Sequence, residues 1–393
     1  MNPPAVKPPA VNPPAVRPPG PANLRADVVG SLLRPPELLE ARDALGRGEM
    51  APAAFKAVED QAVAGAVALQ VEAGLRVVTD GEMRRLSFQS QMTEAVEGFG
   101  PHDLNAFLWG DWEGDETVGG RHIERPAGLG VRDKLRRKRH LSAEEFTALR
   151  ALLADVPGVI PKVCLPSPSL WANFWPHDAP PAAYPTLDAF LADVADILRE
   201  EVAELARLGA EYIQLDAPHY TALLDPRTRS FYQRAGWSVE KWLHQGIALD
   251  NAVMAEAPGV TFGFHLCRGN QASRWLVAGA YDPIAAAIFK NIAAQRLLLE
   301  YDDARSGSFE ALAHLPGDKT AVLGLVTTKS PRQETPEALE TRLREAARFI
   351  PLERLALSPQ CGFATSVLGN ALSPRDQRRK LAVVAETARR VWG

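Results

Sequence analysis

Short apolar runs alternate with long amphipathic stretches along most of this chain, and this alternation limits the folds open to it. Eight runs are almost continuously apolar, as expected for parallel strands that are buried on both faces. They span residues 27–31, 76–80, 159–166, 212–216, 261–267, 296–301, 321–327 and 355–360. The helical stretches include residues 57–74, 187–209 and 373–392, and Gly209 stands where a helix C-cap is expected. Eight strands interleaved with helices predict an α/β fold, the (β/α)8 TIM barrel.

Two segments break this rhythm. Residues 1–22 repeat a proline-rich unit (NPPAV, KPPAV, NPPAV, RPPGP), which favours polyproline II over packed helix or sheet. We expect a disordered tail there, and docking to a proline-binding partner is the alternative. Residues of about 88–158 form a long insertion after the second strand, with a Trp- and Gly-rich stretch. They are predicted to form a small hairpin plus helices, serving as a lid or an oligomer contact, so the barrel domain should cover residues 23–393.

The composition narrows the classes of partner and compartment. With 46% hydrophobic residues, 393 residues can bury a large core, and the net charge of -4 gives no indication of nucleic acid or an anionic membrane as partner. There is no apolar stretch of about 18 residues, so no transmembrane helix is expected, and the N-terminus lacks the apolar core of a secretory signal. Three cysteines are too few for a disulfide framework, so we expect a reducing cytoplasm.

Four residues suited to binding zinc lie at the ends of predicted strands in the second half of the chain. They are His265, Cys267, Glu300 and Cys361. His265 and Cys267 are two apart on one strand and therefore face the same side. Glu300 ends the next strand and Cys361 follows the last, so all four can meet at the face where barrel enzymes place their active sites. The set predicts a Zn²⁺ site, and the alternative is two structural cysteines beside a hydrogen-bonded histidine.

A zinc site of this composition suits chemistry on a thiol. A thiol has an unperturbed pKa of about 8.5, and coordination to zinc deprotonates it while leaving a nucleophilic sulfur. A carboxylate ligand can leave an exchangeable position for the substrate, whereas a structural zinc site usually closes all four positions with cysteine and histidine. We therefore expect transfer of an alkyl group to a zinc-activated thiol.

From about Ala26 onwards, the chain resembles cobalamin-independent methionine synthase, specifically its C-terminal catalytic barrel. The most specific stretches are VVGS (28–31), DGE (80–82), IQLDAP (213–218), HLC (265–267), LEYDD (299–303) and SPQCG (358–362). The resemblance implies a zinc-dependent methyltransferase that makes methionine from homocysteine and a methyl-folate or methyl-corrinoid donor. It also implies that the four residues above bind the zinc.

The same resemblance assigns the amino acid end of homocysteine to Ser31, Glu82 and Asp216. Two carboxylates can hold an ammonium group, and the serine hydroxyl with adjacent amides can hold a carboxylate. The alternatives are a helix N-cap for Asp216 and an ion pair of Glu82 with Arg84 or Arg85.

The donor side departs from the family pattern. The additional N-terminal barrel of the double-barrel form has no counterpart in these residues, so a donor delivered by a partner protein is plausible. The family's acidic residue after the substrate aspartate is Ala217 here. Lys329 lies in TTKSP (327–331), where the family often has a proton-donating histidine, and is a candidate acid or anion contact, otherwise a solvated lysine. Trp171 in SLWANFW (169–175) is a candidate for stacking on a flat donor, otherwise a packing residue.

The chain is also similar to epoxyalkane:coenzyme M transferase, a single barrel that uses H-x-C and a distant cysteine on zinc to open an epoxide with a thiolate. Coenzyme M carries a sulfonate and no amino group, so Glu82 and Asp216 would repel it and favour an amino acid thiol. Lys329 favours the sulfonate mildly. A zinc-binding barrel without transferase activity is the third interpretation.

Overall fold

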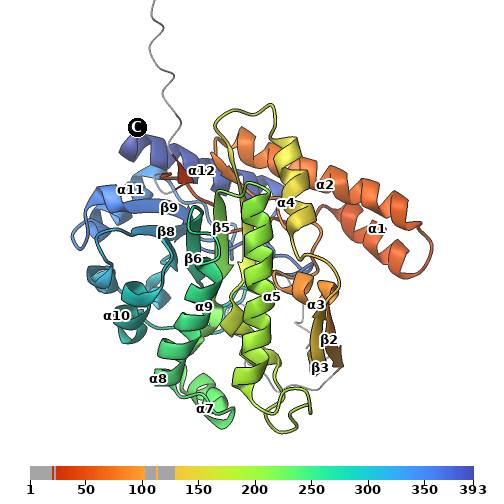
Figure 1. Ribbon diagram of the computed structural model, residues 1–393. Coiled ribbons are helices and arrows are strands. Elements are labelled where there is room, and N and C mark those ends of the chain that lie inside the picture. The colour runs from red at the N-terminus through yellow and green to blue at the C-terminus, as the bar shows by residue number, and fades with distance from the viewer. Residues whose placement is uncertain (1–19, 22–23, 102–111, 114–128) are drawn as a thin grey trace, which may run out of the picture.

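The computed structural model describes residues 20–21, 24–101, 112–113 and 129–393. Seven parallel strands form one curled sheet, in the order β1-β4-β5-β6-β7-β8-β9 (Figure 1). They are β1 (Val77–Val78), β4 (Ile160–Pro166), β5 (Tyr212–Asp216), β6 (Thr261–Leu266), β7 (Arg296–Glu300), β8 (Thr320–Val326) and β9 (Leu355–Pro359). Each lies within about one residue of a predicted run, apart from the shorter β1. Of the proline-rich tail, only Gly20 and Pro21 belong to the described residues.

The predicted first strand, at 27–31, is not a strand of this sheet. Only Ala26 pairs, in a parallel bridge to Leu357 of β9, and Asp27 N donates to Leu357 O at 2.9 Å. This bridge places the segment after β9, in the eighth position of the barrel. The prediction of a regular strand there was wrong, although the predicted barrel is confirmed.

Side chains from inside the barrel explain why residues 27–31 leave the ladder. Side chains of two strands, β4 and β5, and of the loop after β1 donate to backbone carbonyls of this segment. The donors are Lys162 to Val28, Cys164 to Val29 (3.0 Å), Gln214 to Val29 (2.9 Å) and Thr79 to Gly30 (2.6 Å). The segment therefore satisfies its carbonyls without a neighbouring strand, as buried backbone groups require.

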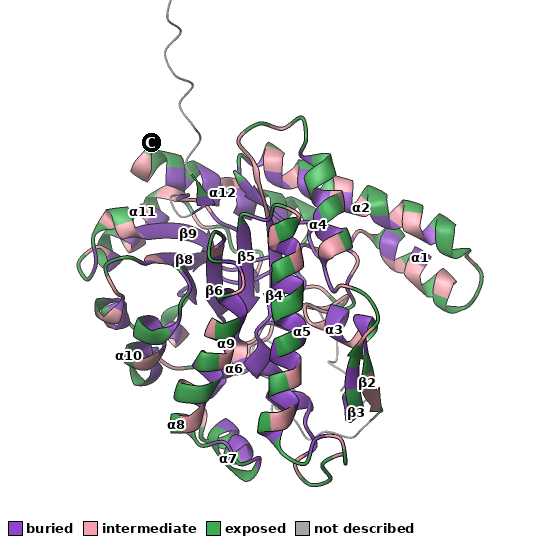
Figure 2. Ribbon diagram, in the orientation of Figure 1, coloured by how far each residue is buried: buried purple, intermediate pink, exposed green. Residues whose placement is uncertain are grey.

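Helices cover the outside of the sheet and turn their exposed faces to solvent (Figures 1 and 2). Apart from α3 (Ser90–Ala95) in the insertion, the helices are α1 (Pro36–Gly46), α2 (Pro52–Glu72), α4 (Ala143–Leu152), α5 (Leu187–Arg207), α6 (Pro218–Ala222), α7 (Pro226–Arg234), α8 (Val239–Lys241), α9 (Ile247–Met254), α10 (Asp282–Asn291), α11 (Pro336–Ala346) and α12 (Pro374–Trp392). Of these, α1 packs on α2 and projects away from the sheet (Figure 1). The predicted stretch 187–209 is α5, which begins after a Thr186 cap on Ala189 N and ends before Gly209 at φ 90°.

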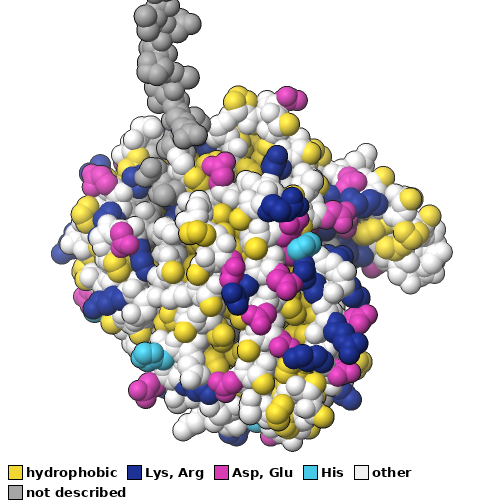
Figure 3. Space-filling view, in the orientation of Figure 1, with side chains coloured by type: hydrophobic (Ala, Val, Ile, Leu, Met, Phe, Trp, Pro, Cys, Tyr) yellow, Lys and Arg dark blue, Asp and Glu magenta, His cyan; other side chains and the backbone are white. Residues whose placement is uncertain are grey.

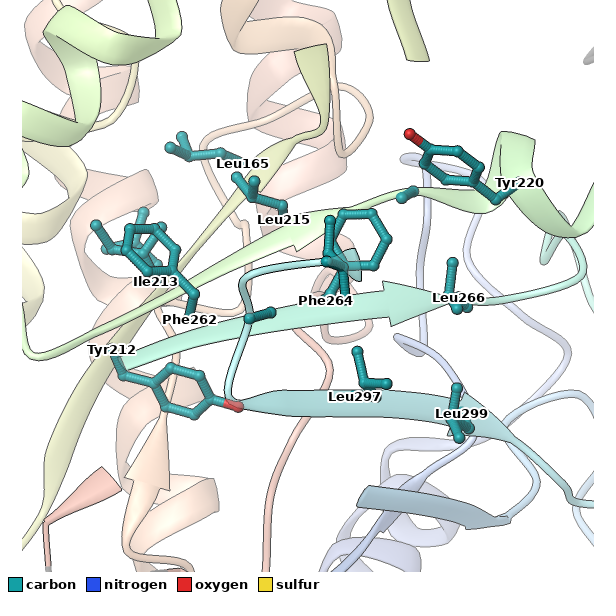
Figure 4. Packing of buried hydrophobic residues seen from close by; sticks show 14 of the residues in the cluster. Leu165, Tyr212, Ile213, Leu215, Tyr220, Phe262, Phe264, Leu266, Leu297 and Leu299 are labelled. Carbon is teal, nitrogen blue, oxygen red and sulfur yellow. The ribbon is translucent and has the colours of Figure 1, made fainter. Parts of the chain in front are cut away.

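Side chains alternate across the strands between the helix layer and the barrel interior. Figure 4 shows the outer set on β5, β6 and β7, which packs as one apolar layer. Its members include Ile213, Leu215, Phe262, Phe264, Leu297 and Leu299, all at most 2% exposed. The intervening residues point inward, so every second side chain of a strand can contribute a polar or reactive group to the barrel interior.

A charged cluster fills the interior at the N-terminal end of the strands. Asp27 accepts hydrogen bonds from Lys162 Nζ at 2.9 Å, Tyr212 OH at 2.8 Å and Arg296 NH2 at 3.0 Å, and the two ion pairs are fully buried. One carboxylate therefore partners two buried cations at the bottom of the barrel. The opposite end, where the strands finish, remains for a functional site.

The insertion after β1 contains the predicted hairpin. It consists of α3 (Ser90–Ala95) and the antiparallel strands β2 (Val96–Pro101) and β3 (Leu129–Arg137), and α4 then leads into β4. Of its Trp- and Gly-rich stretch, the described residues are Trp112 and Glu113. Glu113 forms an antiparallel bridge with Trp275, at 2.8 and 3.0 Å, so the insertion reaches the loop after β6.

The visible surface has acidic and basic side chains interspersed (Figure 3). None of the helices in the described ranges is long and apolar enough to cross a bilayer.

We expect Asp27→Asn to destabilise the barrel by about 3–5 kcal/mol, because Lys162 and Arg296 would lose their buried counter-charge. Urea and thermal unfolding measure the loss. Asp178→Asn is the matched control, since its carboxylate is 89% exposed. Equal stability of the two variants would contradict the structural role of the cluster.

Candidate metal and substrate site

Three predicted metal ligands meet at the C-terminal end of the barrel. His265 lies near the end of β6, Cys267 directly follows this strand, and Cys361 follows β9; one ligand atom from each lies within 4.8 Å of the others. All three are at most 7% exposed. Neither ring nitrogen of His265 has a hydrogen-bond partner among the residues that the structure describes. A buried imidazole with free nitrogens beside two thiols fits a metal ion.

The two thiols differ in acidity. A hydrogen bond from Cys267, aided by the His265 imidazole and opposed by burial, holds the pKa of Cys361 well below its usual range. The same hydrogen bond, together with burial, raises the pKa of Cys267 well above its usual range. The thiolate form, which binds a metal, is therefore favoured at Cys361 over Cys267.

The fourth predicted ligand, Glu300, lies outside this group of three. It ends β7 and is fully buried, and both of its carboxylate oxygens have partners. Oε1 accepts from Lys329 Nζ at 3.1 Å and from Arg305, and Oε2 accepts from the backbone N–H of Arg268 at 2.8 Å. Burial opposes ionisation, but Lys329, Arg305 and Arg268 lower the pKa of Glu300 to about 2. Lys329 is thus a buried partner of Glu300 and not a solvated loop residue.

The residues assigned to the amino acid end also come together. Glu82 and Asp216 belong to a second group whose ligand atoms lie within 4.8 Å of one another. Burial is the main cause that raises the pKa of Glu82 to about 7 and that of Asp216 to about 6. Ser31 is 4% exposed, and its Oγ accepts from Ala364 N at 3.4 Å. Two buried carboxylates with raised pKa values form a site that a cation would stabilise.

One structural alternative for these carboxylates is met in part, since Arg85 and Glu82 form a long ion pair. Arg85 lies 3.9 Å from Glu82, and its hydrogen bonds go to other groups, including Glu145 at 2.7 Å. Asp216 accepts from Gln214 at 2.7 Å, while the N-cap of α6 is Ala217. Glu82 also has φ 55°, a conformation that costs an L-residue about 1 kcal/mol or more. Such a strained, buried carboxylate is typical of a functional site.

The third member of the second group is Cys164, which lies in the predicted apolar run 159–166. On β4 it lies two residues after Lys162, so both side chains point into the barrel. The two-residue spacing of Lys162 and Cys164 was the sequence signal that both side chains face the barrel interior. Only the fold, however, brings it to Glu82 and Asp216.

His265, Cys267 and Cys361 line one cavity of about 510 Å³ together with Glu82 and Asp216 of the second group. Its inner end holds Ser31, Glu82, Asp216, His265, Cys267 and Cys361, and its walls include Leu86, Phe88, Trp112, Phe174, Leu276 and Leu368. The loops at 86–88 and 365–367 pair across its rim, where Leu86 and Leu368 are 46% and 37% exposed. The cavity therefore joins a polar floor to an apolar outer part.

Trp171, predicted to stack on a donor, is fully buried and packs against Phe99 and Phe174 at 5.3 and 4.6 Å between ring centroids. Phe174 lines the cavity, so the aromatic group reaches the site through this residue. His219 is also fully buried, with Nε2 2.8 Å from Ser169 Oγ, and burial lowers its pKa to about 3. It is a neutral packing residue.

Comparison with known proteins identifies the family. Residues 184–382 match the family described as "Cobalamin-independent synthase, Catalytic domain". The chain belongs to the cobalamin-independent methionine synthase family. These enzymes are methyltransferases of methionine biosynthesis, and the predicted family is confirmed.

Individual relatives of the chain span nearly its whole length. It is 33% identical to the uncharacterized protein YxjH of Bacillus subtilis, over 94% of this chain and 95% of YxjH. It is 28% identical to a methionine synthase of Pyrococcus abyssi, over 86% of each. A putative vitamin-B12 independent methionine synthase from Listeria monocytogenes superimposes with a TM-score of 0.70 at 25% identity, over 94% of this chain and 98% of that one.

We expect Cys267→Ser and Cys361→Ser each to abolish high-affinity binding of zinc, because each removes one of two thiolate ligands. Metal content after dialysis against a weak chelator measures this. Cys164→Ser is the matched control and should keep the high-affinity metal. Full occupancy in both of the first two variants would show that these thiols pack without binding metal.

Proposed function

We propose that the chain is a zinc-dependent methyltransferase that forms methionine from homocysteine. The observation that carries this proposal is the shared cavity: a His–Cys–Cys group lies beside a pair of carboxylates suited to an ammonium group. Homocysteine carries a thiol and an amino group at opposite ends of a short chain. One cavity with a thiolate-forming site and a cation site matches both ends.

In this proposal His265, Cys267 and Cys361 hold the zinc, and Glu300 is the fourth ligand or its replaceable neighbour. Bound zinc would supply a Lewis acid that favours the thiolate form of an acceptor sulfur. Lys329 and Arg305 neutralise Glu300, which limits the negative charge beside two thiolates. Lys329 also remains our candidate for giving a proton to the departing donor, since it is a buried ammonium group next to the site.

The other end of the acceptor is held by the chain itself. Glu82 and Asp216 hold the ammonium group, and Ser31 with neighbouring backbone amides holds the carboxylate. Fixing both ends orients the sulfur towards a methyl group that enters through the apolar outer part of the cavity. The apolar walls also exclude water, which would otherwise weaken these interactions.

The donor that we propose is a methyl-folate or a methyl-corrinoid, and delivery by a partner protein is compatible with the exposed leucines at the rim. The cytoplasm is the compartment that we propose, since the three cysteines are free and buried. Epoxide opening with coenzyme M fits less well, because its sulfonate would face two carboxylates.

An alkyl-transfer assay tests the proposal directly. Homocysteine and coenzyme M are each combined with methyl-folate, methylcobalamin and an epoxide, and the thioether products are measured. We expect methionine from homocysteine with one of the two methyl donors. Turnover of coenzyme M alone, or none with homocysteine, would refute the proposed acceptor.

The acceptor affinity should depend on pH through Glu82. The pKa of this carboxyl is about 7 in the folded chain, so acidification protonates it and removes a charge that holds the ammonium. We expect KM for homocysteine to rise roughly tenfold between about pH 8 and pH 6. Glu82→Gln should have a high KM at both pH values.

Glu97→Gln, an exposed glutamate of β2, is the control and should behave as the wild type. A pH-independent KM in the wild type would contradict the assignment of Glu82.

A further inference from the structure

We propose that Glu82, Cys164 and Asp216 form a second metal site, which takes a thiophilic divalent cation such as Zn²⁺ or Cd²⁺ in place of the acceptor's amino group. The inhibition that follows rests on the proposed function, whereas the binding itself does not. One ligand atom from each residue lies within 4.8 Å of the other two. They come from the loop after β1, from β4 and from the end of β5, so the barrel itself holds them together.

The first argument is that the buried carboxylate of Glu82 has no hydrogen bond from a cation among the described residues. Glu82, Cys164 and Asp216 are all at most 7% exposed, and Glu82 Oε2 is buried without a hydrogen-bond partner among the described residues. The nearest cation, Arg85, is 3.9 Å from the other oxygen, and it donates to Glu145 and to the backbone carbonyl of Cys164. A buried carboxylate with an open oxygen favours a cation at that position.

The second argument is the chemistry of Cys164. An ammonium group needs oxygen acceptors, and a thiol is a weak acceptor. Cys164 therefore adds little to amino group recognition, and its own hydrogen bond goes to Val29 O at 3.0 Å. Thiolate sulfur is instead a strong ligand for zinc and cadmium, and two carboxylates complete a mixed sulfur and oxygen set.

The third argument is space. A Cβ atom added at Gly30 would lie 2.6 Å from Glu82 Oε1 and 3.0 Å from Cys164 Sγ. The missing side chain at Gly30 thus lets the carboxylate and the sulfur approach each other. Burial and the neighbouring Asp216 raise the pKa of the Cys164 thiol well above its usual range, so it stays protonated without a metal. Metal binding would release this proton to solvent and form the Cys164–metal bond.

The site predicts inhibition by excess zinc. Zinc bound to Glu82 and Asp216 occupies the oxygens that hold the acceptor's ammonium, so it should compete with homocysteine. Magnesium should not compete, because it prefers oxygen ligands only. The chain would therefore need zinc at one site and be inhibited by zinc at its neighbour.

The test is a titration of the metal-free full-length chain with Zn²⁺, and with Co²⁺ to observe thiolate charge-transfer absorption. We expect a tight equivalent and a weaker second one in the wild type. Cys164→Ser retains a hydrogen-bonding group for Val29 O, and it should weaken the second equivalent roughly tenfold or more while leaving the first unchanged. Cys361→Ser is the reciprocal control and should lose the first equivalent but retain the second.

Binding and kinetics separate the two proposals. Competitive inhibition by micromolar zinc against homocysteine, relieved in Cys164→Ser, supports both. A Cys164-dependent second equivalent in a chain that does not methylate homocysteine keeps the metal site and rejects the proposed function. A single equivalent in the wild type, or an unchanged second equivalent in a folded Cys164→Ser chain, overturns the metal site.

Discussion

The site depends on how residues 26–31 are held inside the barrel. This segment pairs with β9 only at Ala26, and its carbonyls accept hydrogen bonds from the inward side chains of Thr79, Lys162, Cys164 and Gln214. Its first part supplies Asp27, which partners the buried cations Lys162 and Arg296 at the bottom. Its last part supplies Ser31 at the floor of the cavity. The same six-residue segment therefore stabilises the closed end of the barrel and positions residues at the open end.

The carboxylate pair in the cavity is costly to the folded chain. Burial raises the pKa of Glu82 from 4.5 to about 7, so the folded state binds a proton there more tightly than the unfolded state. The stability from this protonated form is fully present below about pH 4.5 and is lost as the pH rises towards 7. At higher pH the buried, ionised Glu82 costs about 3 kcal/mol. A chain selected for stability alone would hold a neutral residue there. The arrangement makes sense if a cation regularly binds and offsets the cost.

The sequence predicted the elements whose local pattern is strong. The run 212–216 is β5, and the stretch 187–209 is α5, because an apolar period and clear caps coincide in both. Spacing on one strand also placed His265 and Cys267 correctly on one face. Interactions between distant side chains could not be predicted. Residues 27–31 were predicted as a strand because they are mostly apolar. In the structure, their backbone carbonyls instead accept hydrogen bonds from side chains inside the barrel. Glu300 stays a predicted ligand, but its partners could not be foreseen from the sequence. They are Lys329 in the loop after β8 and Arg305 in a short 3-10 helix after β7.

Cys164 shows that contacts inside the barrel, and not the local sequence, determine whether a cysteine favours its thiol or its thiolate form. All three cysteines are buried. The three cysteines differ in the side chains that the fold places beside each of them. Cys361 faces Cys267 and an imidazole, so its thiolate is favoured; Cys164 faces Glu82 and Asp216, so its thiol is favoured. The same residue type is therefore set for metal binding beside Cys267 and His265, and held protonated beside the two carboxylates. A thiophilic metal can reverse that second state only by replacing the cation that the carboxylates would otherwise bind. Competition between metal and acceptor then follows from the geometry of a single pocket floor.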